Sequence, residues 1–113
     1  MHELGLCDAL LKKVSRIADE SELEGVNSVT LEVGTLSGVI PRFMADCWKA
    51  VIDGTPYAET ELIIRSVPGT ARCEDCLSVF EADLENLVCP NCGSVRLSPV
   101  SGRDMTIIEI EGY

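Results

Sequence analysis

The sequence has few basic residues, and this scarcity limits the partners that it can bind. Nine lysines and arginines stand against 19 aspartates and glutamates in 113 residues, which gives a formal net charge of −10. Binding of phosphates requires a concentration of Lys and Arg, so nucleic acid is not an expected partner. Anionic membrane surfaces are disfavoured for the same reason. The field of an acidic protein instead favours cations and basic protein surfaces.

Long apolar runs are also missing. No segment of the sequence approaches the roughly 20 apolar residues that a membrane-spanning helix needs. The first residues carry no basic region ahead of an apolar stretch, so we expect no signal peptide and a cytoplasmic protein. With 46% hydrophobic and 25% charged residues, the chain is expected to be globular, as one domain or one domain with a small appendage.

The residue sets of common enzymes are absent as well. We find no Ser-His-Asp set, no open metal site and no glycine-rich loop that could cradle phosphates. We therefore predict that the protein is not an enzyme.

The apolar periodicity predicts a small number of helices and strands. Apolar residues recur three and four positions apart over 4–18 and over 41–53, which predicts two amphipathic helices. Alternation predicts a strand over 28–33, and apolar clusters predict two more over 60–67 and 105–110. A right-handed crossover would make the first two strands parallel. We expect the last strand to pair antiparallel with the strand at 60–67, and both helices to cover one face.

Two hinge-like segments bracket the region that contains the paired cysteines. Pro68-Gly69 precedes this region, and Pro99 to Gly102 follow it. The predicted fold is therefore α+β, with two helices on a small three-stranded mixed sheet and an inserted zinc-ribbon-like module. The expected domains are an α/β domain of residues 1–69 and 99–113 and a zinc-binding domain of residues 70–98.

Four of the six cysteines form two Cys-x-x-Cys pairs, separated by twelve residues: Cys73 with Cys76, and Cys89 with Cys92. A tight turn lets both thiolates of a pair reach one ion, and two such turns complete a tetrahedron. Four thiolates favour a soft or borderline cation, and zinc is our first choice. A site closed by four sulfurs leaves no position for water, so we predict a structural zinc. An iron centre and a redox dithiol pair remain alternatives.

The other two cysteines have a simpler interpretation. Cys7 and Cys47 each lie on the apolar stripe of a predicted helix. A free cysteine behaves as a small buried hydrophobe, so we expect both to pack in the core.

The first three residues, Met1-His2-Glu3, form a second candidate site. The α-amine of Met1, the backbone amide of His2 and the His2 imidazole can close fused chelate rings on one ion, in a nitrogen geometry that Ni(II) and Cu(II) accept. The simpler alternative is a solvated terminal histidine. Glu3 suits the positive end of the first helix without any further role.

Three features occur together in this chain: the initiating Met1-His2-Glu3, the segment Val33-Gly34-Thr35-Leu36-Ser37-Gly38, and the Cys-x2-Cys-x12-Cys-x2-Cys module. In this combination the sequence resembles the HypA/HybF family of hydrogenase nickel incorporation proteins. The resemblance implies a nickel metallochaperone that binds Ni(II) through His2 and the N-terminal backbone of Met1, with Glu3 as a ligand or close by. It also implies a structural zinc at Cys73, Cys76, Cys89 and Cys92.

The same resemblance implies partners. These are a hydrogenase maturation GTPase and the large subunit of a [NiFe]-hydrogenase, which would receive the nickel during maturation. The competing interpretation is a zinc-ribbon adaptor for protein interaction or nucleic-acid binding without nickel chemistry, which the acidic balance opposes for nucleic acid.

Overall fold

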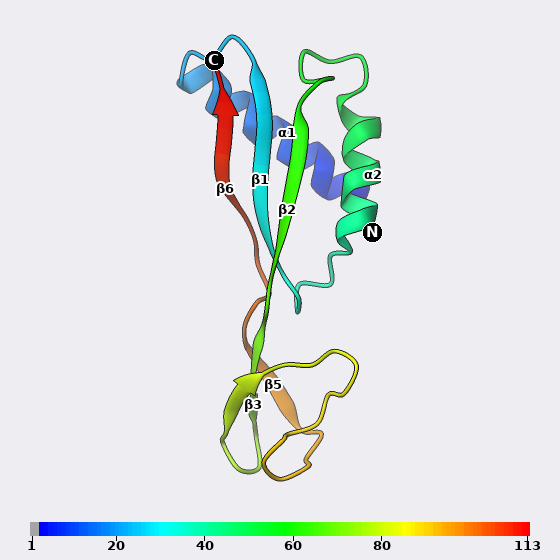
Figure 1. The fold of residues 1–113 in the computed structure, drawn as a ribbon, viewed down its shortest axis with the longest axis vertical. Helices are drawn as coiled ribbons and strands as arrows, with labels where there is room; N and C mark the ends of the chain where they lie inside the picture. The colour runs from blue at the N-terminus through cyan, green and yellow to red at the C-terminus, as the bar shows by residue number, and fades with distance from the viewer. Residues whose placement is uncertain (1–2) are drawn as a thin grey trace.

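The computed structural model describes residues 3–113, and the part of the chain that it describes forms two helices and two small sheets (Figure 1). In chain order the elements are α1 Glu3–Glu20, β1 Val26–Gly34, α2 Pro41–Ile52, β2 Glu61–Val67, β3 Thr70–Cys73, β4 Val79–Glu81, β5 Leu97–Ser101 and β6 Met105–Gly112. The molecule is elongated, with extents of 54 × 24 × 16 Å. Among the described residues, no helix is both long and apolar enough to cross a membrane.

The first sheet has the strand order β2-β1-β6, with β1 in the centre. β1 runs parallel to β2, so the predicted crossover is correct, and antiparallel to β6. The prediction that the last strand pairs with the strand at 60–67 is therefore wrong. Nearly every residue of β1 is buried or half-buried, whereas β2 and β6 carry exposed charges such as Arg65 and Glu109. Charged side chains suit edge strands, so β1 takes the central place.

Both helices pack on one face of this sheet, as predicted. Their apolar stripes and the inward side chains of β1 make a core that includes Val14, Val29, Leu31, Met44 and Trp48. Every one of these residues is at most 2% exposed. This arrangement confirms the predicted α+β class with two helices on a three-stranded mixed sheet.

The loop between α2 and β2 is fixed to the core by Trp48. Its indole Nε1–H donates a hydrogen bond of 3.0 Å to the carbonyl oxygen of Thr60, just before β2 begins. The Thr60 hydroxyl in turn donates to the carbonyl oxygen of Val26 at 2.7 Å. These bonds satisfy buried polar groups, which are costly if unpaired. Gly54, with φ +74°, ends α2 in the left-handed conformation that its position in the sequence predicts.

A narrow waist joins the first sheet to the second sheet, which has the order β4-β3-β5 (Figure 1). Gly34, Gly69 and Gly102 meet there so closely that a Cβ atom on Gly34 or Gly102 would collide with the neighbouring backbone. The segment after β1 ties the two linkers together: Leu36 N–H donates to the Gly102 carbonyl at 2.8 Å, and Thr35 Oγ1 accepts from Gly69 N–H at 2.9 Å. Glycine is required at this crossing because backbone approaches backbone.

Candidate metal centre

The four paired cysteines come together at the far end of the second sheet. Cys73 is the last residue of β3, and Cys76 lies in the turn that follows it. Cys89 and Cys92 lie in the loop between β4 and β5. The four sulfur atoms lie within 4.8 Å of one another, and they form the one group of potential metal ligands of this kind among residues 3–113.

The two Cys-x-x-Cys turns have the same backbone hydrogen bonds. In the first turn, Cys73 N–H donates to the Ser78 carbonyl at 2.9 Å, and Leu77 N–H donates to the Cys73 carbonyl at 2.9 Å. In the second turn the matching bonds, from Cys89 to Ser94 and from Gly93 to Cys89, both measure 2.8 Å. The site is therefore built from two copies of one turn that face each other.

Each turn has one residue with left-handed backbone conformation after its second cysteine. In the second turn this residue is Gly93, with φ +76°, as the sequence suggests. In the first turn it is Leu77, with φ +65°. A leucine rarely adopts this conformation because its Cβ crowds the following carbonyl. Leucine itself gives no signal for a left-handed conformation. Only the position of Leu77 after the second cysteine, which matches the position of Gly93, indicates it.

The sulfur positions fit a tetrahedral ion. The Sγ atoms of Cys73 and Cys92 lie 3.5 Å apart, and those of Cys76 and Cys89 lie 3.6 Å apart. Zinc–sulfur bonds of about 2.3 Å require a sulfur–sulfur separation of roughly 3.8 Å in a tetrahedron. A disulfide would need about 2.05 Å, and all six cysteines are free. The geometry therefore matches a four-thiolate metal site and not a pair of disulfides.

Hydrogen bonds around the sulfurs favour the thiolate form of the first pair. The Ser78 hydroxyl and the Asn91 side-chain amide lie 3.2 and 3.5 Å from the Cys76 sulfur, and they lower the pKa of Cys76 to about 5. The Cys76 backbone amide lowers the pKa of Cys73. Metal ligation requires thiolates, so the first turn is prepared to bind a cation. Neither Ser78 nor Asn91 carries a sequence signal for this role.

The second pair contains the thiol that holds its proton most firmly. The Ser94 backbone amide favours the Cys92 thiolate, but the neighbouring Cys73, burial and the other thiols outweigh it and raise the pKa of Cys92 to about 12. A cation bound by all four sulfurs replaces this proton, so metal binding at the site is coupled to proton release.

The two acidic residues inside the first Cys-x-x-Cys turn pair with arginines. Arg96 Nη1 lies 2.6 Å from Asp75 Oδ1, and Arg72 Nη2 lies 3.3 Å from Glu74 Oε1. The Ser98 hydroxyl, followed by Arg72, lowers the pKa of Glu74. These carboxylates therefore brace the turn and do not compete with the thiolates for the metal.

The other predicted site, at the N-terminus, falls only partly within the described residues. Met1 and His2 lie outside them, so the nickel site there remains a prediction. Glu3 is the first residue of α1, and its Oε2 accepts a hydrogen bond of 3.4 Å from the backbone N–H of Ile40. Ile40 is the N-cap of α2. The Glu3 carboxylate therefore links the starts of the two helices.

Cys7 and Cys47 pack in the core region, as predicted. Cys7 is fully buried, and its thiol lies 3.3 Å from the Met44 carbonyl oxygen and 3.8 Å from the Met44 sulfur. Burial, followed by Cys47 and Glu3, raises the pKa of Cys7 to about 11. Cys47 is half-buried against the same core. A protonated and buried thiol is chemically inert, which suits a packing role.

Comparison with known proteins connects this geometry to one family. The family model described as "Hydrogenase/urease nickel incorporation, metallochaperone, hypA" matches residues 1–112. A hydrogenase maturation factor HypA of Rhodopseudomonas palustris (strain TIE-1) is 35% identical over 111 residues, which cover 98% of each chain. The corresponding factor of Aquifex aeolicus is 32% identical over 98% of this chain and 96% of its own.

Solved structures share the fold. The solution structure of the Ni metallochaperone HypA from Helicobacter pylori aligns with a TM-score of 0.69, covering 99% of this chain and 97% of that one. The sequence identity in this alignment is 20%, so the likeness concerns the fold.

Proposed function

The chain belongs to the HypA family of hydrogenase and urease nickel incorporation metallochaperones, and on that premise we propose that it binds Ni(II) at its N-terminus and delivers it to the large subunit of a [NiFe]-hydrogenase during maturation. The family consists of metallochaperones, not enzymes. Its relatives act in hydrogenase maturation, so the protein belongs to that machinery. A maturation GTPase is the second partner that we propose.

The observation that carries this proposal is the extent of the family match, which begins at residue 1 and so includes Met1-His2-Glu3. In the proposed site, the Met1 amine, the His2 amide and the His2 imidazole supply nitrogen ligands, and Glu3 supplies a carboxylate close by. The hydrogen bond from Ile40 N–H to Glu3 supports this arrangement, since it fixes the carboxylate at the start of both helices. A site with few ligands, at a chain terminus, suits an ion that must be released.

We also propose that the four-cysteine site holds a structural zinc. The sulfur separations near those of a zinc tetrahedron support this, as does the absence of an open coordination position in a four-thiolate site. The proposed division has residues 1–69 and 99–113 as the nickel domain and residues 70–98 as the zinc domain. The separate second sheet supports the existence of this module, and its last strand, β5, continues past residue 98 to Ser101. Six free cysteines support a reducing, cytoplasmic compartment.

A nickel titration of the zinc-loaded protein tests the proposal. Calorimetry and absorption spectroscopy near neutral pH are expected to show about one Ni(II) bound per chain, with the absorption of a square-planar nitrogen site. Both His2→Ala and a variant with one extra residue before Met1 should lose this binding, because the first removes the imidazole and the second displaces the amine. Zinc content should stay unchanged in both.

The extended variant is the sharper control, since it keeps every side chain of the native protein. Affinity for nickel should also fall as the pH drops through about 6.5, where the imidazole becomes protonated. Equal nickel affinity in the native chain and both variants would refute the terminal site.

A further inference from the structure

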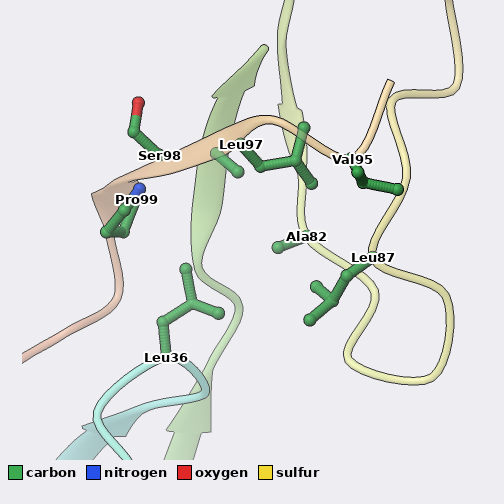
Figure 2. A pocket seen from close by; sticks show the side chains of 8 residues that line it. Leu36, Ala82, Leu87, Val95, Leu97, Ser98 and Pro99 are labelled. Atoms are coloured by element: carbon green, nitrogen blue, oxygen red, sulfur yellow. The ribbon is translucent and has the colours of Figure 1, made fainter. Parts of the chain in front are cut away.

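An apolar groove lies on the second sheet beside the waist (Figure 2). It has a volume of about 290 Å³. Leu97 and Pro99 line it from β5, Ala82 and Leu87 from the loop after β4, and Leu36 from the loop after β1. Figure 2 shows Leu36 pointing toward the side chains of the second sheet. The groove is therefore shared between the two sheets.

Two large apolar side chains of this groove are open to solvent. Val95, at its edge, is 73% exposed, and Leu87 is 49% exposed. Half of the large apolar side chains that are exposed among the described residues lie in the stretch 70–101: Leu77, Val79, Leu84, Leu87, Val95 and Val100. An exposed apolar surface is typical of interaction sites, and Leu87 and Val95 supply such exposed groups at this groove.

The size and lining of the groove indicate what kind of group fits it. Its volume is at the lower limit of the roughly 300–1,000 Å³ that small-molecule pockets occupy. The Ser98 hydroxyl is the one polar side chain in the lining, and it already bonds to Glu74. Such a groove lacks the convergent polar groups that orient a cofactor, and it suits one or two apolar side chains of a protein segment.

The loop that lines the groove is acidic. Glu81 and Asp83 flank Ala82, and Glu85 lies two residues before Leu87. All three acidic residues are exposed, and none of them forms an ion pair within the described residues. The two arginines nearby in the sequence are already paired with Glu74 and Asp75. The rim therefore presents unbalanced negative charge, which complements a basic partner and speeds its approach.

We infer that this groove is a docking site for a partner protein segment that presents a large apolar side chain flanked by lysines or arginines. The apolar side chain fills the space between Leu36, Leu87 and Leu97, and the flanking cations lie over the acidic loop. Since Leu36 belongs to the segment that leads to α2, the docked segment contacts both parts of the molecule. Docking requires no nickel, so the inference stands independently of the terminal nickel site.

The inference is tested with the zinc-loaded full chain, labelled with ¹⁵N, and a short synthetic peptide that carries a central Leu-Leu pair flanked by lysines. Titration is expected to shift the amide signals of Leu36, Leu87, Val95 and Leu97. A peptide with glutamates in place of the lysines, and one with Ala-Ala in the centre, should leave these signals unmoved. Salt of about 1 M, where screening acts within about 3 Å, should weaken binding.

Matched variants separate the apolar and the charged contributions. Val95→Ser is expected to weaken peptide binding about tenfold, because it removes an apolar contact at the edge of the groove. Val79→Ser removes another exposed valine, at 59%, that does not line the groove, and should bind as the native chain does. The triple variant Glu81→Gln, Asp83→Asn and Glu85→Gln should lose most of the salt dependence. Zinc content confirms that each variant is folded.

Three results would overturn the inference. The first is the absence of shifts at these residues with the lysine-flanked peptide, and the second is equal binding of the glutamate-flanked peptide. The third is a concentration-dependent dimer of the native chain that Val95→Ser abolishes, which would assign the groove to a second copy. Nickel binding by Val95→Ser should equal that of the native chain, so failure of the docking site and failure of the nickel site are distinguishable.

Discussion

The two sheets of this protein each have three strands but are stabilised by different forces. The first sheet and its two helices enclose a cluster of eleven buried apolar residues. The second sheet buries three, namely Ala71, Cys73 and Cys89, and two of these are candidate metal ligands. A module with so little apolar burial needs a covalent or metal crosslink to fold. Hydrophobic burial therefore holds one half, while the candidate crosslink of the other half is its four-cysteine cluster.

Metal removal is expected to have the largest effect, because it should unfold one half of the molecule and leave the other half folded. A chelator should unfold residues 70–101 and leave the first sheet folded, because binding at structural zinc sites supplies about 10–16 kcal/mol of folding free energy. In an NMR amide spectrum, the signals of the second sheet should collapse while those of Leu31 and Trp48 stay in place. Collapse of both sets at the same chelator concentration would mean that the halves fold as one unit.

The Leu31→Ala substitution tests the opposite half. Leu31 is 0% exposed in the central strand, and its truncation should lower the free energy of unfolding by about 3 kcal/mol through lost burial and a residual cavity. Urea unfolding followed by the fluorescence of Trp48, the single tryptophan, measures this change. Leu84→Ala, at a side chain 56% exposed, serves as the control and should change the value by less than about 0.5 kcal/mol. Loss of zinc from Leu31→Ala would contradict separate stabilisation.

The Leu77→Gly substitution is expected to have the smallest effect, a slight gain in zinc affinity. It relieves the left-handed strain at φ +65° and removes a side chain that is 67% exposed, so little burial is lost. Because glycine also increases the freedom of the unfolded chain, the net gain should be at most about 1 kcal/mol, or about fivefold in zinc affinity. Competition with a chromophoric chelator measures it. The mirror change, Gly93→Ala, should weaken zinc binding, and equal affinities in all three chains would show that the turn conformation carries no cost.

Much of the first half could be predicted because its signals are local. The apolar stripe that includes Cys7, Val14 and Ala18 predicts α1, and the alternation of Val29, Leu31 and Val33 predicts β1. The strand order could not be predicted this way, since pairing depends on which strand is buried on both faces. In the central strand β1, even the polar side chains of Ser28 and Thr30 are buried. Polar side chains do not predict burial, so the sequence does not indicate that β1 is central.

The candidate metal site could likewise be predicted only in part. The spacing of its cysteines is enough to predict a four-thiolate site, because ligand spacing is a property of the chain. The hydrogen bond from the Asn91 side-chain amide to the Cys76 sulfur arises only when the two turns face each other. Sequence also provides no sign of the groove, whose lining residues are separated by up to 63 positions between Leu36 and Pro99.

By itself, then, the amino-acid sequence determined the two helices, the three strands of the first sheet, the grouping of four cysteines into a candidate metal site and the family of this protein, because periodicity and ligand spacing are encoded along the chain. Tertiary structure alone decided that β1 is central, that Leu77 adopts a left-handed backbone, and that Leu36 reaches across the glycine waist to line a groove on the second sheet. These features depend on contacts between segments far apart in sequence, and their free energies exist only once those segments meet.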